Sequence, residues 1–192
     1  MAAPRLIFLA GPNGAGKSTF YAAFLQDAGL PFVNADRMAA ALGVSDAEAA
    51  AAADQTRAYL LKNRESFATE TVFSDPVGAK LQFLRDAIGA GYRVTLYFIG
   101  IASAQLSAAR VTQRVQSGGH DVPPDRLERR YRQSLANLAA ALKFVPEAHV
   151  FDNSSATEPY RLVLSVRDGK PVFSAEQLPA SLASVLRTRD GN

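Results

Sequence analysis

Short apolar runs alternate along the chain with segments in which apolar residues recur every three or four positions. The runs predict buried strands, because a strand that is covered on both faces has no polar side. We expect strands at 6–9, 32–34, 66–69, 92–101 and 149–151. The periodic segments predict amphipathic helices. We expect these at 17–26, 45–64, 76–88, 104–116 and from Pro123 or Pro124 to Leu142.

Local signals place several element ends. Ser45-Asp46-Ala47-Glu48 fits a capping box, which predicts a helix start. Gly29-Leu30-Pro31 ends the first helix, and Gly89 and Gly91 end the helix before the long apolar strand. Asp168-Gly169 predicts a tight turn, so residues 161–174 are expected to form a β-hairpin. A closing helix follows at 177–186.

Strands that alternate with helices predict an α/β fold. We expect three layers: a mainly parallel five-stranded sheet with helices on both faces, plus a C-terminal β-hairpin and helix. No linker rich in Pro, Gly or Ser divides the 192 residues, so residues 1–192 are expected to form one domain.

Composition removes several kinds of site. The chain has no cysteine, which excludes disulfides, thiolate metal sites and a cysteine nucleophile. With two histidines, His120 and His149, a zinc site is not expected. The apolar run after Arg5 is too short for a signal peptide or a membrane span. We therefore expect a cytoplasmic protein without a membrane partner.

The net charge of +3 is concentrated in one segment. Residues 110–132 hold six arginines against three acidic residues, and the remaining 15 basic and 15 acidic residues balance. A mild, local excess suits a phosphate-handling site better than a nucleic-acid surface, which needs a broader basic stripe. We therefore expect no nucleic-acid partner.

The strongest motif is a phosphate-binding loop. Residues 11–18, Gly-Pro-Asn-Gly-Ala-Gly-Lys-Ser, match G-x-x-x-x-G-K-[ST] at every fixed position, between an expected strand and an expected helix. The glycines let successive backbone N–H groups face one anion, Lys17 can reach the β- and γ-phosphates, and Ser18 can ligate Mg²⁺. The motif predicts ATP or GTP binding. The expected nucleotide-binding residues are Gly11, Asn13, Gly14, Ala15, Gly16, Lys17, Ser18 and Thr19.

Other sequence features narrow the class of nucleotide-binding protein. The chain lacks the Asn-Lys-x-Asp element that reads guanine, and its one conspicuous D-x-x-G, at 86–89, falls at an expected helix end. It also lacks an ABC-type signature and is too short for an AAA+ core with its lid domain. These features favour a small kinase.

Two acidic residues are expected at strand ends, where ligands bind in doubly wound sheets. Asp36 follows the second strand and could be the base that takes a proton from an acceptor hydroxyl; alternatively, it is only the N-cap of a following helix. Glu70 ends the third strand, where it could hold Mg²⁺ or bind the acceptor together with Thr71.

Arginines are expected to supply positive charge to the transferred phosphoryl group. Arg110 and Arg114 are four residues apart, on one face of an expected helix, and Ser117-Gly118-Gly119 follows them. This arrangement is typical of a kinase lid, here over about 110–132, although a solvated helix face is the alternative. His120 would be a lid contact, and Arg126 and Arg130 share a second face.

In six segments the chain resembles the zeta toxin family of P-loop kinases. They are GPNGAGKST (11–19), FVNAD (32–36), FATETVFS (67–74), GYRVTLYFIG (91–100), ARVTQRVQSGGHDVP (109–123) and FDNS (151–154). The resemblance implies a nucleotide-kinase-like fold. It also implies transfer of phosphate from ATP·Mg²⁺ to a sugar hydroxyl of UDP-N-acetylglucosamine, and an antitoxin as a protein partner.

By matching position, the resemblance also implies residue roles. Lys17 and Ser18 would serve the phosphates and the metal, and Asp36 would be the general base. One of Arg110 and Arg114 would be a transition-state arginine. Glu70 would be the family's acidic residue at a strand end. An acidic substrate contact in the family aligns with Asp54.

Two alternatives stay open at this stage. The chain could phosphorylate an unrelated small-molecule hydroxyl, or it could be a non-catalytic module that binds ATP and a partner protein. The two classes differ in whether ADP release rises when an acceptor is added.

Overall fold

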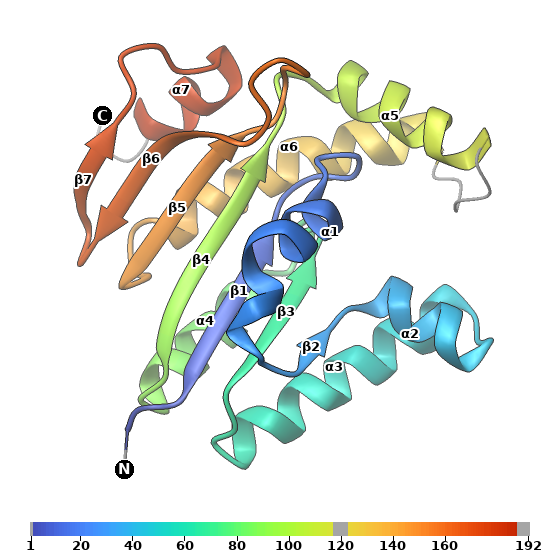
Figure 1. The fold of residues 1–192 in the computed structure, drawn as a ribbon, viewed down its shortest axis with the longest axis vertical. Helices are drawn as coiled ribbons and strands as arrows, with labels where there is room; N and C mark the ends of the chain where they lie inside the picture. The colour runs from blue at the N-terminus through green and yellow to red at the C-terminus, as the bar shows by residue number, and fades with distance from the viewer. Residues whose placement is uncertain (1, 117–122, 188–192) are drawn as a thin grey trace.

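A computed structural model describes residues 2–116 and 123–187, which form a seven-stranded sheet with helices on both faces (Figure 1). The strand order is β2-β3-β1-β4-β5-β6-β7. The bounds are β1 Arg5–Ala10, β2 Phe32–Val33, β3 Phe67–Thr71, β4 Arg93–Gly100, β5 Glu147–Asp152, β6 Arg161–Arg167 and β7 Lys170–Ser174. Strands β1 to β5 pair in parallel, and β6 and β7 add to the same sheet as antiparallel strands.

The helices connect these strands. Their bounds are α1 Lys17–Phe20, η1 Tyr21–Leu25 (π), η2 Gln26–Ala28 (3₁₀), α2 Ala35–Leu42, α3 Asp46–Lys62, α4 Ala79–Gly89, α5 Ala104–Gln116, α6 Pro124–Ala141 and α7 Ala180–Arg187. None of the helices in the described ranges combines the length and the apolar composition that a bilayer span needs.

The predicted α/β layout is confirmed, with differences at element ends. The segment expected to be helical from residue 76 begins at Ala79, because Gly78 adopts a left-handed conformation (φ 76°) and forms the N-cap. The helix expected at 17–26 changes from α to π to 3₁₀ geometry before it ends at Gly29. The capping box at Ser45 and Glu48 forms as predicted. The predicted hairpin at 161–174 forms strands β6 and β7, which extend the main sheet instead of forming a separate unit.

Strand β1 divides the core into two layers, because successive side chains of a strand point to opposite faces. Leu6 and Phe8 belong to a cluster that packs with α3, α4, α6 and α7. Ile7 and Leu9 belong to a second cluster that packs with α1 and η1. Both layers bury β1, so its carboxyl end is fixed from both sides, and the phosphate-binding loop begins there.

The sheet register brings the acidic strand ends next to that loop. Leu9 of β1 pairs with Glu70 of β3, and Val33 of β2 pairs with Thr69. The carboxyl ends of β1, β2 and β3 therefore meet at one edge of the sheet, as expected for a doubly wound fold.

Candidate active site

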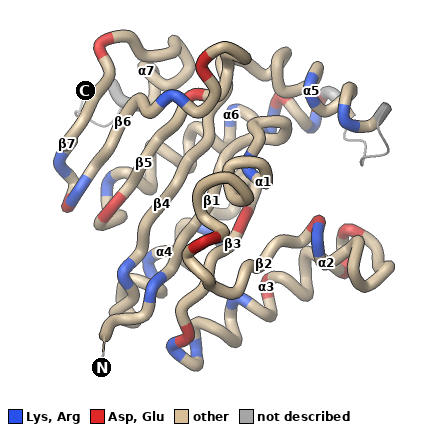
Figure 2. Tube along the Cα trace, in the orientation of Figure 1, with Lys and Arg blue, Asp and Glu red and all other residues tan. Residues whose placement is uncertain are grey.

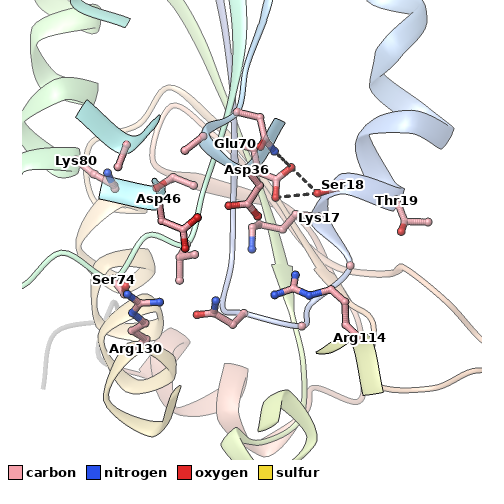
Figure 3. Close-up of a pocket in the computed structure, with 18 of the residues that line it drawn as sticks. Lys17, Ser18, Thr19, Asp36, Asp46, Glu70, Ser74, Lys80, Arg114 and Arg130 are labelled. Carbon is pink, nitrogen blue, oxygen red and sulfur yellow. Dashed lines mark hydrogen bonds between the residues drawn. The ribbon is translucent and has the colours of Figure 1, made fainter. Parts of the chain in front are cut away.

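A cleft of about 550 Å³ lies at this edge of the sheet (Figure 3). Its walls come from the phosphate-binding loop with α1, the ends of β2 and β3, and helices α2 to α6. The residues that line it are Asn13, Gly14, Gly16, Lys17, Ser18, Thr19, Asn34, Ala35, Asp36, Asp46, Ala50, Asp54, Arg57, Glu70, Thr71, Val72, Ser74, Lys80, Arg110, Arg114 and Arg130.

Glycine is required at two positions where the phosphate-binding loop passes close to other segments of the same chain. At Gly11 (φ 146°) a Cβ atom would lie 2.2 Å from the Ile99 carbonyl oxygen. At Gly16 (φ 87°) it would lie 2.7 Å from Nδ2 of Asn153. Any side chain at these positions would displace the loop, so the glycines let it curl tightly against β4 and the segment after β5.

Two polar side chains hold the loop from outside the cleft. Asn153 Nδ2 donates to the Ala15 carbonyl at 2.9 Å, and Tyr160 Oη donates to the Gly16 carbonyl at 2.9 Å. Asn153 Oδ1 in turn accepts from the Tyr160 backbone N–H at 3.3 Å. Because these carbonyls are bound from outside, the loop is held in the curled form in which its N–H groups can face an anion.

Lys17 is buried at the mouth of the loop, where its Nζ donates to the Pro12 carbonyl at 3.0 Å. Burial lowers the pKa of Lys17; Glu70 and Asp36 raise it by a smaller amount, and Arg114 lowers it. The Lys17 amine is therefore close enough to Glu70, Asp36 and Arg114 to be affected by their charges. A bound phosphate would favour its charged form.

Ser18, Glu70 and Asn34 form a connected group beside Lys17. Ser18 Oγ lies 3.1 Å from Oε1 and 3.0 Å from Oε2 of Glu70, and Asn34 Nδ2 donates to Oε2 at 2.8 Å. Asn34 is buried, and its Oδ1 accepts from the Arg37 backbone N–H at 2.9 Å. One amide thus caps α2 and fixes the Glu70 carboxylate.

Asp36 lies in the first turn of α2, and its side chain lines the cleft above Lys17 (Figure 3). The alternative in which Asp36 is the N-cap of this helix is wrong, because Asn34 occupies that position. The side chain of Asp36 thus lies at the N-terminal end of α2, beside the phosphate-binding loop. Asp36 is therefore available as a proton acceptor at the centre of the cleft.

Arg110 and Arg114 reach the cleft from α5, so their predicted common face is confirmed. Figure 2 shows α5 with basic positions only, and acidic positions on β3 and α2. Arg110 Nη2 lies 3.5 Å from the Ser154 carbonyl, and Ser107 of the same helix donates to the Asn13 carbonyl at 2.7 Å. Helix α5 is thus fastened to the loop that its arginines approach.

The far end of the cleft is built by α3, α4 and α6. Asp54 and Arg57 of α3 form an ion pair, and Arg57 Nη1 donates to Thr69 Oγ1 at 3.1 Å. Lys80 of α4 and Arg130 of α6 line the same end. Figure 3 shows Lys80 across Asp46 and Asp36 from Ser18 of the phosphate-binding loop.

The segment after β3 is clamped to α6. Phe73 is buried with φ at 61°, an uncommon conformation for a bulky residue. Asn137 Nδ2 donates to the carbonyls of Phe73 at 2.9 Å and Asp75 at 3.3 Å, and Ser134 Oγ donates to the Val72 carbonyl. These bonds compensate for the uncommon backbone and fix the chain that connects Glu70 to α4.

Most of the predicted site residues meet in this cleft. Gly11 and Ala15 do not line it: Gly11 lies against Ile99, and the side chain of Ala15, within the loop, is fully buried. Of the two arginines expected on a second face, Arg130 lines the cleft and Arg126 does not. His120, predicted as a lid contact, lies outside the described residues.

Sequence reasoning missed several residues of the site. Asn34 and Asn153 lie inside the quoted segments 32–36 and 151–154, so the signal was present but was not assigned. Ser74 ends the quoted segment 67–74, and it too was not assigned. Arg57 and Lys80 carry no local motif, and they reach the cleft only because α3 and α4 pack beside the end of β3.

The residues beside Lys17 fit a magnesium ion. The Ser18 hydroxyl and the Glu70 carboxylate bring oxygen donors together, which is the ligand chemistry of Mg²⁺. Within the described ranges, no group of three or more His, Cys, Asp or Glu side chains could enclose a metal.

Comparison with known proteins shows the family of this chain. The sequence model of the family described as zeta toxin matches residues 31–162. The chain belongs to this family. A Haemophilus influenzae protein described as uncharacterized is 31% identical over 132 residues, which cover 66% of this chain and 92% of that protein.

Solved structures share the fold of this zeta toxin family member. The AvrRxo1-ORF1:AvrRxo1-ORF2 structure with sulphate ions matches with a TM-score of 0.69 at 20% identity, over 97% of this chain and 63% of that chain. A further structure of that complex, with ATP, gives 0.63 at 20% identity. The PezAT chromosomal toxin-antitoxin system of Streptococcus pneumoniae gives 0.59 at 16% identity, over 100% and 80% of the two chains.

These matches confirm the predicted P-loop kinase-like fold. The chain spans less than two thirds of the AvrRxo1-ORF1:AvrRxo1-ORF2 chain that it matches.

Proposed function

We propose that this zeta toxin family member is a kinase that transfers the γ-phosphate of ATP to a hydroxyl of a small molecule. One observation carries the proposal: a phosphate-binding loop and a carboxylate that can act as a base, Asp36, line the same cleft. A module that only binds nucleotide needs the first of these features but not the second.

The phosphate end of the cleft binds and orients ATP. The loop N–H groups cradle the phosphates, and Lys17 moves from the Pro12 carbonyl to the β- and γ-phosphates. Arg110 and Arg114 approach from α5 and stabilise the charge on the phosphoryl group during transfer. Catalysis here comes from positioning and charge, without a covalent enzyme intermediate.

Asp36 accepts the proton of the acceptor hydroxyl. The hydroxyl oxygen forms a bond to the γ-phosphorus while the bond from phosphorus to the β-phosphate oxygen breaks, and ADP leaves. The products are ADP, the phosphorylated acceptor and the proton on Asp36, which solvent then removes. Asn34 fixes α2, and so the position of Asp36, by capping the helix.

Ser18 and Glu70 would hold Mg²⁺ at the phosphate end. The ion, when bound, neutralises negative charge on the phosphates. Asn34 keeps the Glu70 carboxylate turned toward Ser18 through its bond to Oε2.

The acceptor that we propose is a UDP-activated amino sugar such as UDP-N-acetylglucosamine. Membership of the zeta toxin family supports this choice, as does a cleft that continues past Asp36 to polar residues on α3, α4 and α6. A kinase for an unrelated hydroxyl remains the alternative that the experiment must separate.

The test is incubation with Mg·ATP and a panel of UDP-sugars, with ADP release and product mass as readouts. A phosphorylated UDP-amino sugar that the Asp36→Asn variant does not form supports the reaction and the base. Slow ADP release that no acceptor accelerates would reject this acceptor class.

We also infer a protein partner. The PezAT structure describes a toxin-antitoxin system, and the AvrRxo1 structures pair two reading frames. Co-expression with the product of the adjacent reading frame, followed by size-exclusion chromatography, tests this. Separate elution of the two products at micromolar concentration would contradict it.

A further inference from the structure

A second cavity opens beside the far end of the cleft. It has a volume of about 230 Å³, and its wall is partly aromatic, from Phe8 and Phe83. It shares Asp54, Arg57, Thr71 and Lys80 with the cleft, and it is also lined by Ala58 and Ala79. The two cavities are therefore neighbours, and these four shared residues form the boundary between them.

Lys80 is the basic residue at this boundary that is still available to a ligand. Arg57 is buried and already donates to Thr69 and Asp54. Among the residues that the structure describes, the Lys80 ammonium has no hydrogen-bond or ion-pair partner; only its backbone N–H is engaged, by Asp75. A half-buried ammonium without a partner is unfavourable, so an anion at this position would stabilise it.

Charged groups of both signs surround Lys80. Burial lowers the pKa of Lys80, Arg57 lowers it further, and Asp54 and Asp75 raise it. Asp54 is engaged by Arg57, so it does not neutralise Lys80 by direct contact. At the start of α4, Asp75 Oδ2 accepts from the Lys80 backbone N–H at 3.4 Å, so a carboxylate already faces the positive end of this helix.

The position of Lys80 separates it from the reaction. Figure 3 shows Lys80 and the phosphate-binding loop on opposite sides of Asp36. A group that reaches Lys80 is therefore not the transferred phosphoryl group. It is a part of the acceptor that lies away from the reacting hydroxyl.

We propose that Lys80 is a specificity-determining residue that receives an anionic group of the acceptor, a phosphate or a carboxylate. This inference rests on the proposed kinase function and adds which side chain binds the anionic part of the acceptor. The neighbouring cavity leaves room for the acceptor to continue beyond Lys80, along the wall that includes Phe83. A neutral sugar alone would leave the ammonium unpaired and would bind weakly.

The experiment measures binding without turnover, so that it does not depend on the correct acceptor. With the nucleotide end saturated by Mg·AMP-PNP, calorimetry compares two anions with their neutral counterparts: UDP with uridine, and glucuronate with glucose. The variants are Lys80→Met, Lys80→Arg and the control Lys62→Met, at an exposed position near the end of α3. Thermal melts monitored by circular dichroism establish that each variant is folded.

We expect Lys80→Met to weaken the binding of at least one anion by roughly tenfold or more, as for the loss of a charge-assisted hydrogen bond. The neutral counterparts and Lys62→Met should change less than about twofold, and Lys80→Arg should retain most of the affinity. Loss for UDP alone identifies a phosphate site, and loss for glucuronate alone identifies a carboxylate site.

Two results would overturn the inference: equal anion affinity in Lys80→Met and wild type, or a wild type that binds neither anion more tightly than its neutral counterpart. A failure of the proposed acceptor gives a different result. If UDP-N-acetylglucosamine is not phosphorylated but anion binding still depends on Lys80, the acceptor is a different anion and the role of Lys80 stands.

Discussion

The two ends of the cleft are built in different ways. The phosphate end is one continuous piece of chain, residues 11–19, whose shape depends on glycines and on bonds to backbone carbonyls. The far end is assembled from single side chains on α3, α4 and α6. A short motif can specify the first kind of site, whereas the second kind exists only after the sheet and helices have packed.

This difference suggests a division of labour. The phosphate end recognises a part that all nucleoside triphosphates share, so a fixed backbone nest suffices. The far end recognises the acceptor, and its residues can change one at a time without disturbing the loop. Asp36 lies between the two ends. Variants should therefore separate nucleotide binding from acceptor use.

The largest expected effect is at Asp36. The Asp36→Asn variant removes the proton acceptor but keeps the shape and the helix turn, so acceptor-dependent ADP release should fall by about 10²–10⁴. ATP affinity, measured by calorimetry, should stay within about threefold. The control is Asp27→Asn, at an exposed position in η2. Full turnover by Asp36→Asn would remove this residue from the mechanism.

Lys17 tests the phosphate end. The Lys17→Ala variant loses the ammonium group that stabilises the negative charge of the β- and γ-phosphates during transfer, so kcat/KM should fall by about 10²–10³. Unlike the change at Asp36, this one should also weaken ATP binding. Steady-state kinetics and nucleotide titration check it, with the exposed Lys62→Ala as the matched control. If Lys17→Ala lowered turnover but left ATP affinity unchanged, as expected for Asp36→Asn, the assignment of Lys17 to the phosphates would be refuted.

Tyr160 tests whether the loop is held from outside. The Tyr160→Phe variant removes only the hydroxyl that donates to the Gly16 carbonyl, so ATP affinity should fall by roughly threefold to tenfold. The KM for the acceptor should not change, because Tyr160 does not line the cleft. Tyr59→Phe, at a position that is 62% exposed, is the control. A change confined to acceptor KM would contradict the proposed division.

The smallest expected effect is a proton taken up when ATP binds. Burial lowers the pKa of Lys17, so in alkaline solution below pH 10.5 part of the free protein carries a neutral amine. Phosphate favours the charged form, so binding should take up a fraction of one proton and weaken as pH rises. Calorimetry in two buffers of different ionisation enthalpy measures the uptake. Equal uptake by Lys17→Arg would contradict the assignment to Lys17.

The sequence predicts the phosphate end of the cleft better than it predicts the far end. The loop at 11–18, the acidic residues Asp36 and Glu70, and the common face of Arg110 and Arg114 all depend on local spacing, and the structure brings them together. Asp36 was expected at a strand end, but β2 ends at Val33 and Asp36 lies in the first turn of α2. The order of strands in the sheet and the joining of the hairpin to it depend on long-range pairing, which local spacing does not contain.

Asn34 and Lys80 show why the remaining site residues were not predicted. Asn34 was visible next to Asp36, but its bond to Glu70 joins residues 36 positions apart and requires β2 to pair with β3. Lys80 comes just after the turn at Gly78, and it reaches the cleft because α4 packs beside α3 and the end of β3, which no local pattern shows.

The fate of the γ-phosphate tests the central claim most directly. The protein would be incubated with Mg²⁺, ATP labelled at the γ-phosphate and UDP-N-acetylglucosamine, and the products separated. The account predicts label on a hydroxyl of the acceptor in equal amount to the ADP formed, and none from Asp36→Asn. Label released only as inorganic phosphate, at a rate that the acceptor does not change, would contradict it.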